Sequence, residues 1–216
     1  MGTSSSSPYI DSGGQQTTPQ DIVNELKSGL QRFLDGQSAH PHATEARRHQ
    51  LAGGQHPQVA VLACSDSRVP VEVIFDAGFG DLFVIRNAGN TNTFGSAGSI
   101  EYAVADLGIC VLLVMSHQGC GAVKAAYLTG QDFSPSLSEL VNDIKSGLNN
   151  HGFSTDDQKT YEQACIAHSR ITAEALVQDS DVIRDAVSNK TLLVQPAFLH
   201  IDPLSITWLE PLYGKD

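Results

Sequence analysis

Long apolar runs and basic clusters are both missing from this sequence. The longer apolar runs, such as residues 109–115, fall far short of the ~20 residues that a membrane-spanning helix needs. Lys and Arg number only 13 against 24 Asp and Glu, which gives a formal net charge of -11 without a basic cluster. A chain of this kind offers no footprint for a phosphate backbone. We therefore expect no membrane span and no nucleic-acid partner.

Cysteine is too sparse for a disulfide scaffold. Four cysteines in 216 residues are far below the density of small disulfide-rich secreted proteins, so metal binding or catalysis is the better interpretation. With 41% hydrophobic and 17% charged residues, the chain has the composition of a folded, soluble protein. The location we expect is the cytoplasm, or the stroma or lumen of an organelle after removal of any targeting segment.

The first sixteen residues are rich in Ser, Gly and Gln and lack the apolar and basic regions of an intact secretory signal. We expect residues 1–16 to be a flexible tail or an expression remnant. The length that is left suits one domain, over residues 17–216.

Strand-like and helix-like segments alternate along this domain. Short apolar runs predict buried strands at 59–63, 82–85 and 109–115. Helical spacing predicts helices at 17–34, 69–77, 96–107, 121–128, 137–148, 161–177 and 182–187. Two later strands, expected at the edge of the sheet, are predicted at 191–195 and 205–209. The pattern indicates an α/β fold, with a central, mostly parallel β-sheet flanked by helices and an N-terminal helical arm.

Polar side chains follow the carboxyl ends of the predicted strands, where open parallel sheets bind their ligands. Cys64 ends one strand, and His117 and Cys120 follow another. Two thiolates and one imidazole leave a tetrahedral zinc ion one open position, which is typical of catalytic sites. Such an ion lowers the pKa of bound water to near 7 and so creates hydroxide at neutral pH.

Asp66 and Arg68 lie in the turn after Cys64. A guanidinium group within ~4–6 Å favours the ionised form of a carboxyl group. The ionised Asp66 could then accept a hydrogen bond from zinc hydroxide and orient it. Such help is useful because two thiolate ligands weaken the acidity of the metal.

Residues 64–68 (CSDSR) and 117–121 (HQGCG) together resemble the signature of the β-class carbonic anhydrases, and residues 81–90 and 98–104 resemble further blocks of that family. The resemblance covers about residue 18 to residue 209. It implies reversible hydration of CO2 to bicarbonate and a proton, with one Zn2+ per chain, at sites along a homodimer interface. Its metal ligands would be Cys64, His117 and Cys120, and its catalytic dyad would be Asp66 and Arg68.

The same resemblance implies a substrate pocket. Gln55 would offer its amide to the substrate, Phe83 and Tyr102 would line an apolar CO2 pocket, and Ala88 and Gly89 would lie beside it. We expect Phe83 and Tyr102 to come from a neighbouring protomer, which requires a dimer or a higher even-numbered oligomer.

Two positions bear on differences within the family. His200 stands where many relatives have Tyr. In some members of the family, bicarbonate can close the zinc site. The pattern of these members has Trp three residues before the zinc Cys and Arg twenty-two residues after it, and the matching positions here are Val61 and Arg86. Because Val61 has no indole donor for a bound bicarbonate, we expect the open state, with Asp66 paired to Arg68.

Simpler interpretations remain for several residues. A single buried Cys is often only a small core residue, and an Asp-x-Arg turn is often an ordinary ion pair. Cys165 and His168 share a helix face and could form a second metal site, but a packed Cys and a solvated His are the better expectation.

Two other functions fit the same pattern. One is a zinc hydrolase of CS2 or COS on the same fold. The other is a non-catalytic, zinc-stabilised bicarbonate-binding scaffold, which should have lost Asp66 or Arg68, although both are present.

Overall fold

The computed structural model describes residues 17–128 and 131–214, so the predicted tail at 1–16 lies outside the described residues. The α-helices are α1 (Pro19–Leu34), α2 (Glu45–Gln50), α3 (Val71–Ile74), α4 (Phe94–Ala105), α5 (Gly121–Ala126), α6 (Pro135–Asn150), α7 (Tyr161–Asp179) and α8 (Asp181–Ser188). The strands are β1 (Val59–Cys64), β2 (Leu82–Asn87), β3 (Val111–His117), β4 (Leu193–His200) and β5 (Ser205–Trp208). Three short 3-10 helices are η1 (Leu51–Gly53), η2 (Ala88–Asn90) and η3 (Gln158–Thr160).

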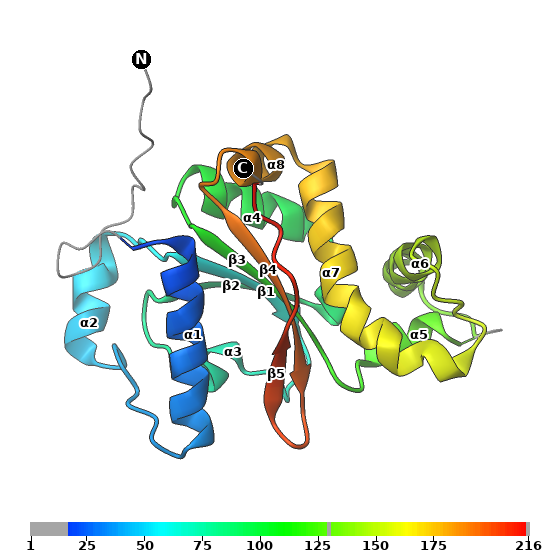
Figure 1. The fold of residues 1–216 in the computed structure, drawn as a ribbon, viewed down its shortest axis with the longest axis horizontal. Coiled ribbons are helices and arrows are strands. Elements are labelled where there is room, and N and C mark those ends of the chain that lie inside the picture. Colours follow the sequence, from blue (N-terminus) through cyan, green and yellow to red (C-terminus); the bar gives the residue numbers. More distant parts are fainter. Residues whose placement is uncertain (1–16, 129–130, 215–216) are drawn as a thin grey trace.

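The sheet has the strand order β2-β1-β3-β4-β5 (Figure 1). Its first four strands are parallel and β5 is antiparallel, so the prediction of a mostly parallel sheet is confirmed. The expectation that both later strands lie at the edge is wrong for β4, which pairs with β3 and β5 and buries seven of its eight residues. Gln195 and Pro196 interrupt the apolar run there, and the Gln195 amide is satisfied by the Leu209 carbonyl oxygen at 2.6 Å.

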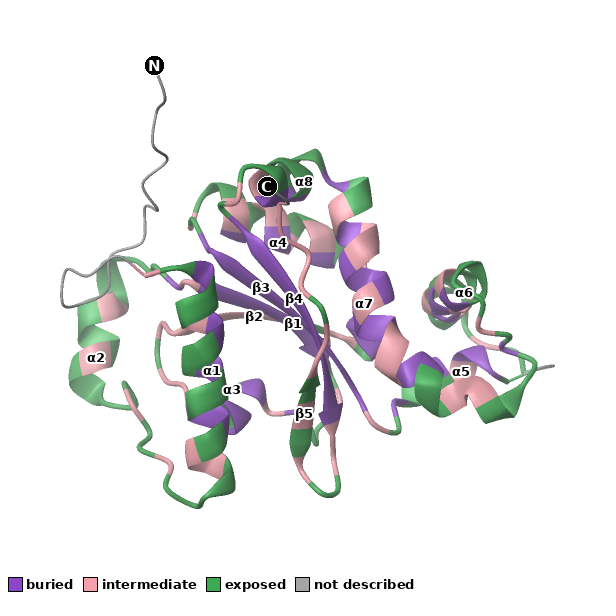
Figure 2. Ribbon diagram, in the orientation of Figure 1, coloured by how far each residue is buried: buried purple, intermediate pink, exposed green. Residues whose placement is uncertain are grey.

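Helices cover both faces of the sheet, which explains why β1 and β3 are apolar at almost every position (Figures 1 and 2). On one face, α1 and α3 pack against side chains that include Val61 and Leu113. On the other face, α4, α7 and α8 pack against the alternate side chains, including Leu62 and Leu112. No α-helix of the described residues is long and apolar enough to cross a bilayer.

A third apolar cluster closes the carboxyl ends of the strands. It joins α5, α6 and the first half of α7 to the ends of β1 and β4, and it includes Cys64, Cys120 and Cys165. Side chains at these strand ends are therefore held in a packed, water-poor environment.

The N-terminal arm is attached to the domain through Asp76. This carboxylate is fully buried and accepts hydrogen bonds from Arg32 Nε (2.7 Å), Ala39 N (3.0 Å) and His40 N (2.9 Å). Asp76 has a positive φ of 48°, which is uncommon for a residue other than Gly. The chain turns here, so the predicted helix at 69–77 is only four residues long, as α3.

We predict that Asp76→Asn makes the stability of the protein less dependent on pH in acid. The Arg32 guanidinium holds the pKa of Asp76 at about 2, below the unfolded value of about 3.9. The ionised carboxylate thus contributes stability above pH ~4, and this contribution is lost as pH falls towards 2. In thermal unfolding over a pH series, Asp76→Asn should have a lower midpoint at pH 7 and a shallower decline between pH 4 and 2.

The matched control is Asp35→Asn, which removes an exposed carboxylate from the end of the same arm. It should retain the decline of the wild type. A decline in Asp76→Asn as steep as that of the wild type would contradict the assignment of the acid sensitivity to this anchor.

Candidate metal centre

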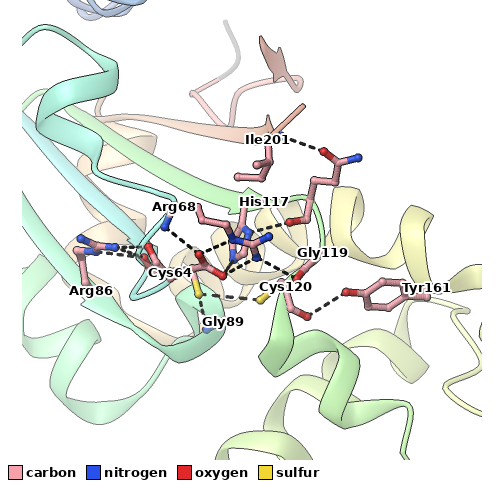
Figure 3. Close-up of polar contacts among 11 residues, drawn as sticks. Cys64, Arg68, Arg86, Gly89, His117, Gly119, Cys120, Tyr161 and Ile201 are labelled. Atoms are coloured by element: carbon pink, nitrogen blue, oxygen red, sulfur yellow. Dashed lines mark hydrogen bonds and ion pairs between the residues drawn. The ribbon is translucent and has the colours of Figure 1, made fainter. Parts of the chain in front are cut away.

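Three predicted ligands meet at the carboxyl ends of β1 and β3 (Figure 3). Cys64 and His117 are the last residues of these strands, and Cys120 precedes α5 after a turn in which Gly119 adopts a φ of +67°. Their ligand atoms all lie within 4.8 Å of one another, and the two sulfurs are 4.0 Å apart. All three residues are buried. Within the described residues, this is the group of three that could hold a metal ion.

The state of His117 fits a metal ligand. Its Nδ1 lies 3.0 Å from the Gln118 carbonyl oxygen, and because a carbonyl can only accept, Nδ1 carries the hydrogen. Nε2 is then left with a lone pair, and it is buried with no hydrogen-bond partner in the described part of the chain. An unpartnered buried nitrogen costs free energy, which coordination to a metal would offset. One imidazole and two sulfurs are the donor set that zinc prefers.

The two sulfurs lie close enough, at 4.0 Å, for each to affect the pKa of the other. The hydrogen bond with Cys120 lowers the pKa of Cys64, and the Gly89 N–H, which donates to Cys64 Sγ at 3.3 Å, acts in the same direction. The pKa of Cys120 is raised by the same Cys64 sulfur and by burial. The contact between the sulfurs thus favours the thiolate form of Cys64, and a bound metal would require both thiols to be deprotonated.

Asp66 and Arg68 form the ion pair that their spacing predicts. Arg68 Nε and Nη2 donate to the two carboxylate oxygens at 2.9 Å and 2.7 Å, and Arg68 N donates to Asp66 Oδ1 at 3.0 Å. This arginine holds the pKa of Asp66 well below its usual range. Asp66 Oδ2 lies 3.8 Å from His117 Nε2, so an ionised carboxylate faces the ligand atoms. Asp66 and Arg68 are thus paired, and the open state of the site stays a prediction.

Arg86 has a structural role that the sequence did not reveal. Its guanidinium donates to the carbonyl oxygens of Cys64 (3.1 and 3.0 Å) and Asp66 (2.7 Å). It therefore fixes the turn that carries one ligand and the paired carboxylate. This role could be inferred from the pairing of Ala63 with Arg86 in neighbouring strands, but that pairing is known only once the strand register is known.

The residues of the predicted substrate pocket do not all lie in one place in a single protomer. Ala88 and Gly89 lie in η2, directly after β2, and Gly89 N donates to the candidate ligand Cys64 at 3.3 Å. Phe83 and Tyr102 contact each other with ring centroids 6.2 Å apart, and Tyr102 is 48% exposed. Gln55 is exposed and precedes β1, so it lies at the opposite end of that strand from the metal centre. A single protomer does not bring Gln55 to the site.

His168 differs from the expectation, and His200 has a hydrogen-bond partner in the neighbouring strand. His168 is not solvated but buried, and its Nε2 lies 2.7 Å from the Gly89 carbonyl oxygen. Cys165 beside it is packed in the core, as expected. His200 lies at the end of β4, where its Nε2 is 2.9 Å from Thr207 Oγ1 across the hairpin.

Comparison with known proteins agrees with this geometry. Residues 59–203 match the family model described as carbonic anhydrase. The chain is 44% identical over 110 residues to carbonic anhydrase 2 of Mycobacterium tuberculosis, covering 51% of this chain and 53% of that protein. It is 44% identical over 128 residues to a carbonic anhydrase of Mycolicibacterium smegmatis, covering 59% and 62%. The matched part thus spans about half to three fifths of the length of these relatives.

Solved structures share the fold. The β-carbonic anhydrase CcaA is similar with a TM-score of 0.68 and 25% identity, over 91% of this chain and 93% of that chain. A structure from a study of two tetrameric β-carbonic anhydrases of Sordaria macrospora is similar with a TM-score of 0.63 and 26% identity, over 88% and 94%.

We predict one zinc ion per chain and its loss on replacing any of the three ligands. Cys64→Ala, His117→Ala and Cys120→Ala each remove one of three donors, so metal analysis of the purified proteins should show little zinc. Cys110→Ala is the matched control, since Cys110 is equally buried but lies outside the ligand group, and it should keep full occupancy. Full zinc occupancy in Cys64→Ala would remove this cysteine from the ligand set.

Proposed function

Because the chain belongs to the carbonic anhydrase family and has the fold of its β class, we propose that it catalyses the reversible hydration of CO2 to bicarbonate and a proton, with one Zn2+ per chain. The observation that carries this proposal is the ionised Asp66 carboxylate, held by Arg68 and facing three buried metal-ligand atoms. Three protein ligands leave a tetrahedral metal one open position for the reacting water.

When bound, the metal would lower the pKa of a water ligand to about 7. The side chains around the open position would orient this water and bind the substrate. Asp66, kept ionised by Arg68, would accept a hydrogen bond from the reacting water and so direct a lone pair towards the carbon of CO2. A protonated Asp66 would lose this acceptor role and could donate instead.

The substrate is small, linear and uncharged, so it needs an apolar pocket more than a charged one. Ala88 and Gly89 would supply the wall nearest the metal. Phe83 and Tyr102 would supply the aromatic wall, and Gln55 a hydrogen bond. We propose that these last three reach the site of a neighbouring protomer.

The exposure of β2 supports such an assembly. All of β1 and β3 is buried, whereas none of the six residues of β2 is buried, although β2 carries Phe83 and leads directly into the metal centre. Tyr102 on α4 is half exposed beside it. A second copy of the chain packed over β2 would cover this surface and would leave the sites along the interface. The similar structure from Sordaria macrospora is of a tetrameric β-carbonic anhydrase.

We predict that Asp66→Asn retains zinc but loses at least ~10-fold in kcat for CO2 hydration, the size typical of losing a group that orients a metal ligand. The amide keeps the shape of the carboxylate but removes its charge. Stopped-flow CO2 hydration together with metal analysis measures both effects. Asp106→Asn, which removes an exposed surface carboxylate, is the control and should match the wild type. Unchanged kcat in Asp66→Asn would rule out the orienting role.

The wild type in the same assay separates the proposed function from its rivals. Hydration of CO2 that a chelator abolishes supports a carbonic anhydrase. Hydrolysis of CS2 or COS without CO2 hydration would instead indicate a related hydrolase. A protein that holds zinc but turns over none of the three would be a scaffold.

We also predict that the active species is a dimer or a higher even-numbered oligomer. Sedimentation velocity combined with activity measurements across the fractions tests this, because a shared site requires two copies. Tyr102→Asp would place a charge in the expected interface and should lower both association and kcat. An active 23.0 kDa species would contradict the shared site.

A further inference from the structure

A buried histidine on α7 connects to the metal centre through one glycine. His168 is only 3% exposed, and its Nε2 is 2.7 Å from the carbonyl oxygen of Gly89, 79 positions away in the sequence. A carbonyl oxygen can only accept a hydrogen bond, so Nε2 must carry the hydrogen. Burial lowers the pKa of His168, which favours the neutral ring, and the bond to the carbonyl oxygen selects this tautomer.

Gly89 passes the contact to the metal ligand. Its N–H donates to Cys64 Sγ at 3.3 Å, while its carbonyl oxygen accepts from His168. Its φ is +73°, and a Cβ atom here would lie 2.9 Å from Ile144 Cδ1 and 3.0 Å from Ala122 Cβ. The two peptide groups on either side of Gly89 are therefore held in a confined turn, with one bonded to the histidine and the other to the sulfur.

The other nitrogen of the ring makes this arrangement costly. His168 Nδ1 is buried and has no hydrogen-bond partner in the part of the chain that the structure describes. An unpartnered buried acceptor costs free energy, and a smaller apolar residue would avoid it. The ring thus buries one nitrogen without compensation and gains a single hydrogen bond, the one to Gly89.

We propose that His168 is a positioning residue, which holds Gly89 so that its N–H donates to Cys64 Sγ and thereby limits how much charge that sulfur gives to the metal. Hydrogen bonds to ligating sulfurs reduce their donation, and groups that orient ligands affect both metal affinity and metal acidity. His168 touches neither the ligand atoms nor the substrate. This inference depends on the metal site of the proposed function.

The test uses the full-length protein loaded with Co2+, whose sulfur-to-metal charge-transfer absorption reports the donation of the thiolates. His168→Leu removes the donor at similar volume and should shift this band. It should also speed metal loss to a chelator by about 10-fold, in line with the loss of other ligand-orienting groups. His168→Gln places an amide N–H near the position of Nε2 and should restore both values to within about 2-fold of the wild type.

Thr172→Val is the control, because Thr172 is buried one turn further along α7 and is not among the residues bonded to η2. It should match the wild type. A wild-type band in a folded His168→Leu protein would overturn the proposal, as would equal shifts in the Leu and Gln variants. If the Leu variant does not fold, His168→Asn, whose amide is too short to reach Gly89, takes its place with the same expected shift. Wild-type protein that binds no Co2+ would instead contradict the metal site itself.

Discussion

The parallel register of β1, β2 and β3 is the constraint on which the metal centre depends. It places Ala63 beside Met115 and Cys64 beside Asn87, so that the ends of three strands deliver one ligand, a second ligand and a glycine-containing turn to the same place. A shift of one residue in β1 would point Cys64 to the other face of the sheet. Val61 and Leu62 pack in separate apolar clusters on the two covered faces, so the packing of the core and the position of Cys64 are linked.

Hydrogen bonds then hold what the register brings together. Arg86 binds the carbonyl oxygens of Cys64 and Asp66, and Arg68 binds the Asp66 carboxylate through both oxygens. On the opposite side, Tyr161 donates to the Cys120 carbonyl oxygen at 3.1 Å (Figure 3). Rigid ligands matter because a catalytic metal needs a defined open position, which mobile side chains would fill or distort.

The sequence predicted the strands β1, β2 and β3, most of the helices and the three candidate ligands, because each depends on local patterns: apolar runs, helical spacing and polar residues at strand ends. It did not predict α2, which buries no residue and so has no apolar face to mark it. It missed what depends on contacts between distant segments. The interior position of β4 was missed because Gln195 looks too polar for a buried strand, whereas its buried amide donates to the carbonyl oxygens of Pro196 and Leu209. The role of Arg86 requires the strand register, and the burial of His168 requires the packing of α7 on η2. The pocket residues Gln55, Phe83 and Tyr102 depend on a second copy of the chain and stay predictions.

The two edge strands of the sheet differ in length, and this difference limits how further copies of the chain could pair with the sheet. β5 offers four residues in an antiparallel hairpin, whereas β2 offers six residues of a parallel strand with no partner on its outer side in the described residues. Short edge strands discourage further pairing. A contact between β2 of one copy and β2 of another would use the same surface on both copies, so it would close after two subunits and would not extend into a fibre.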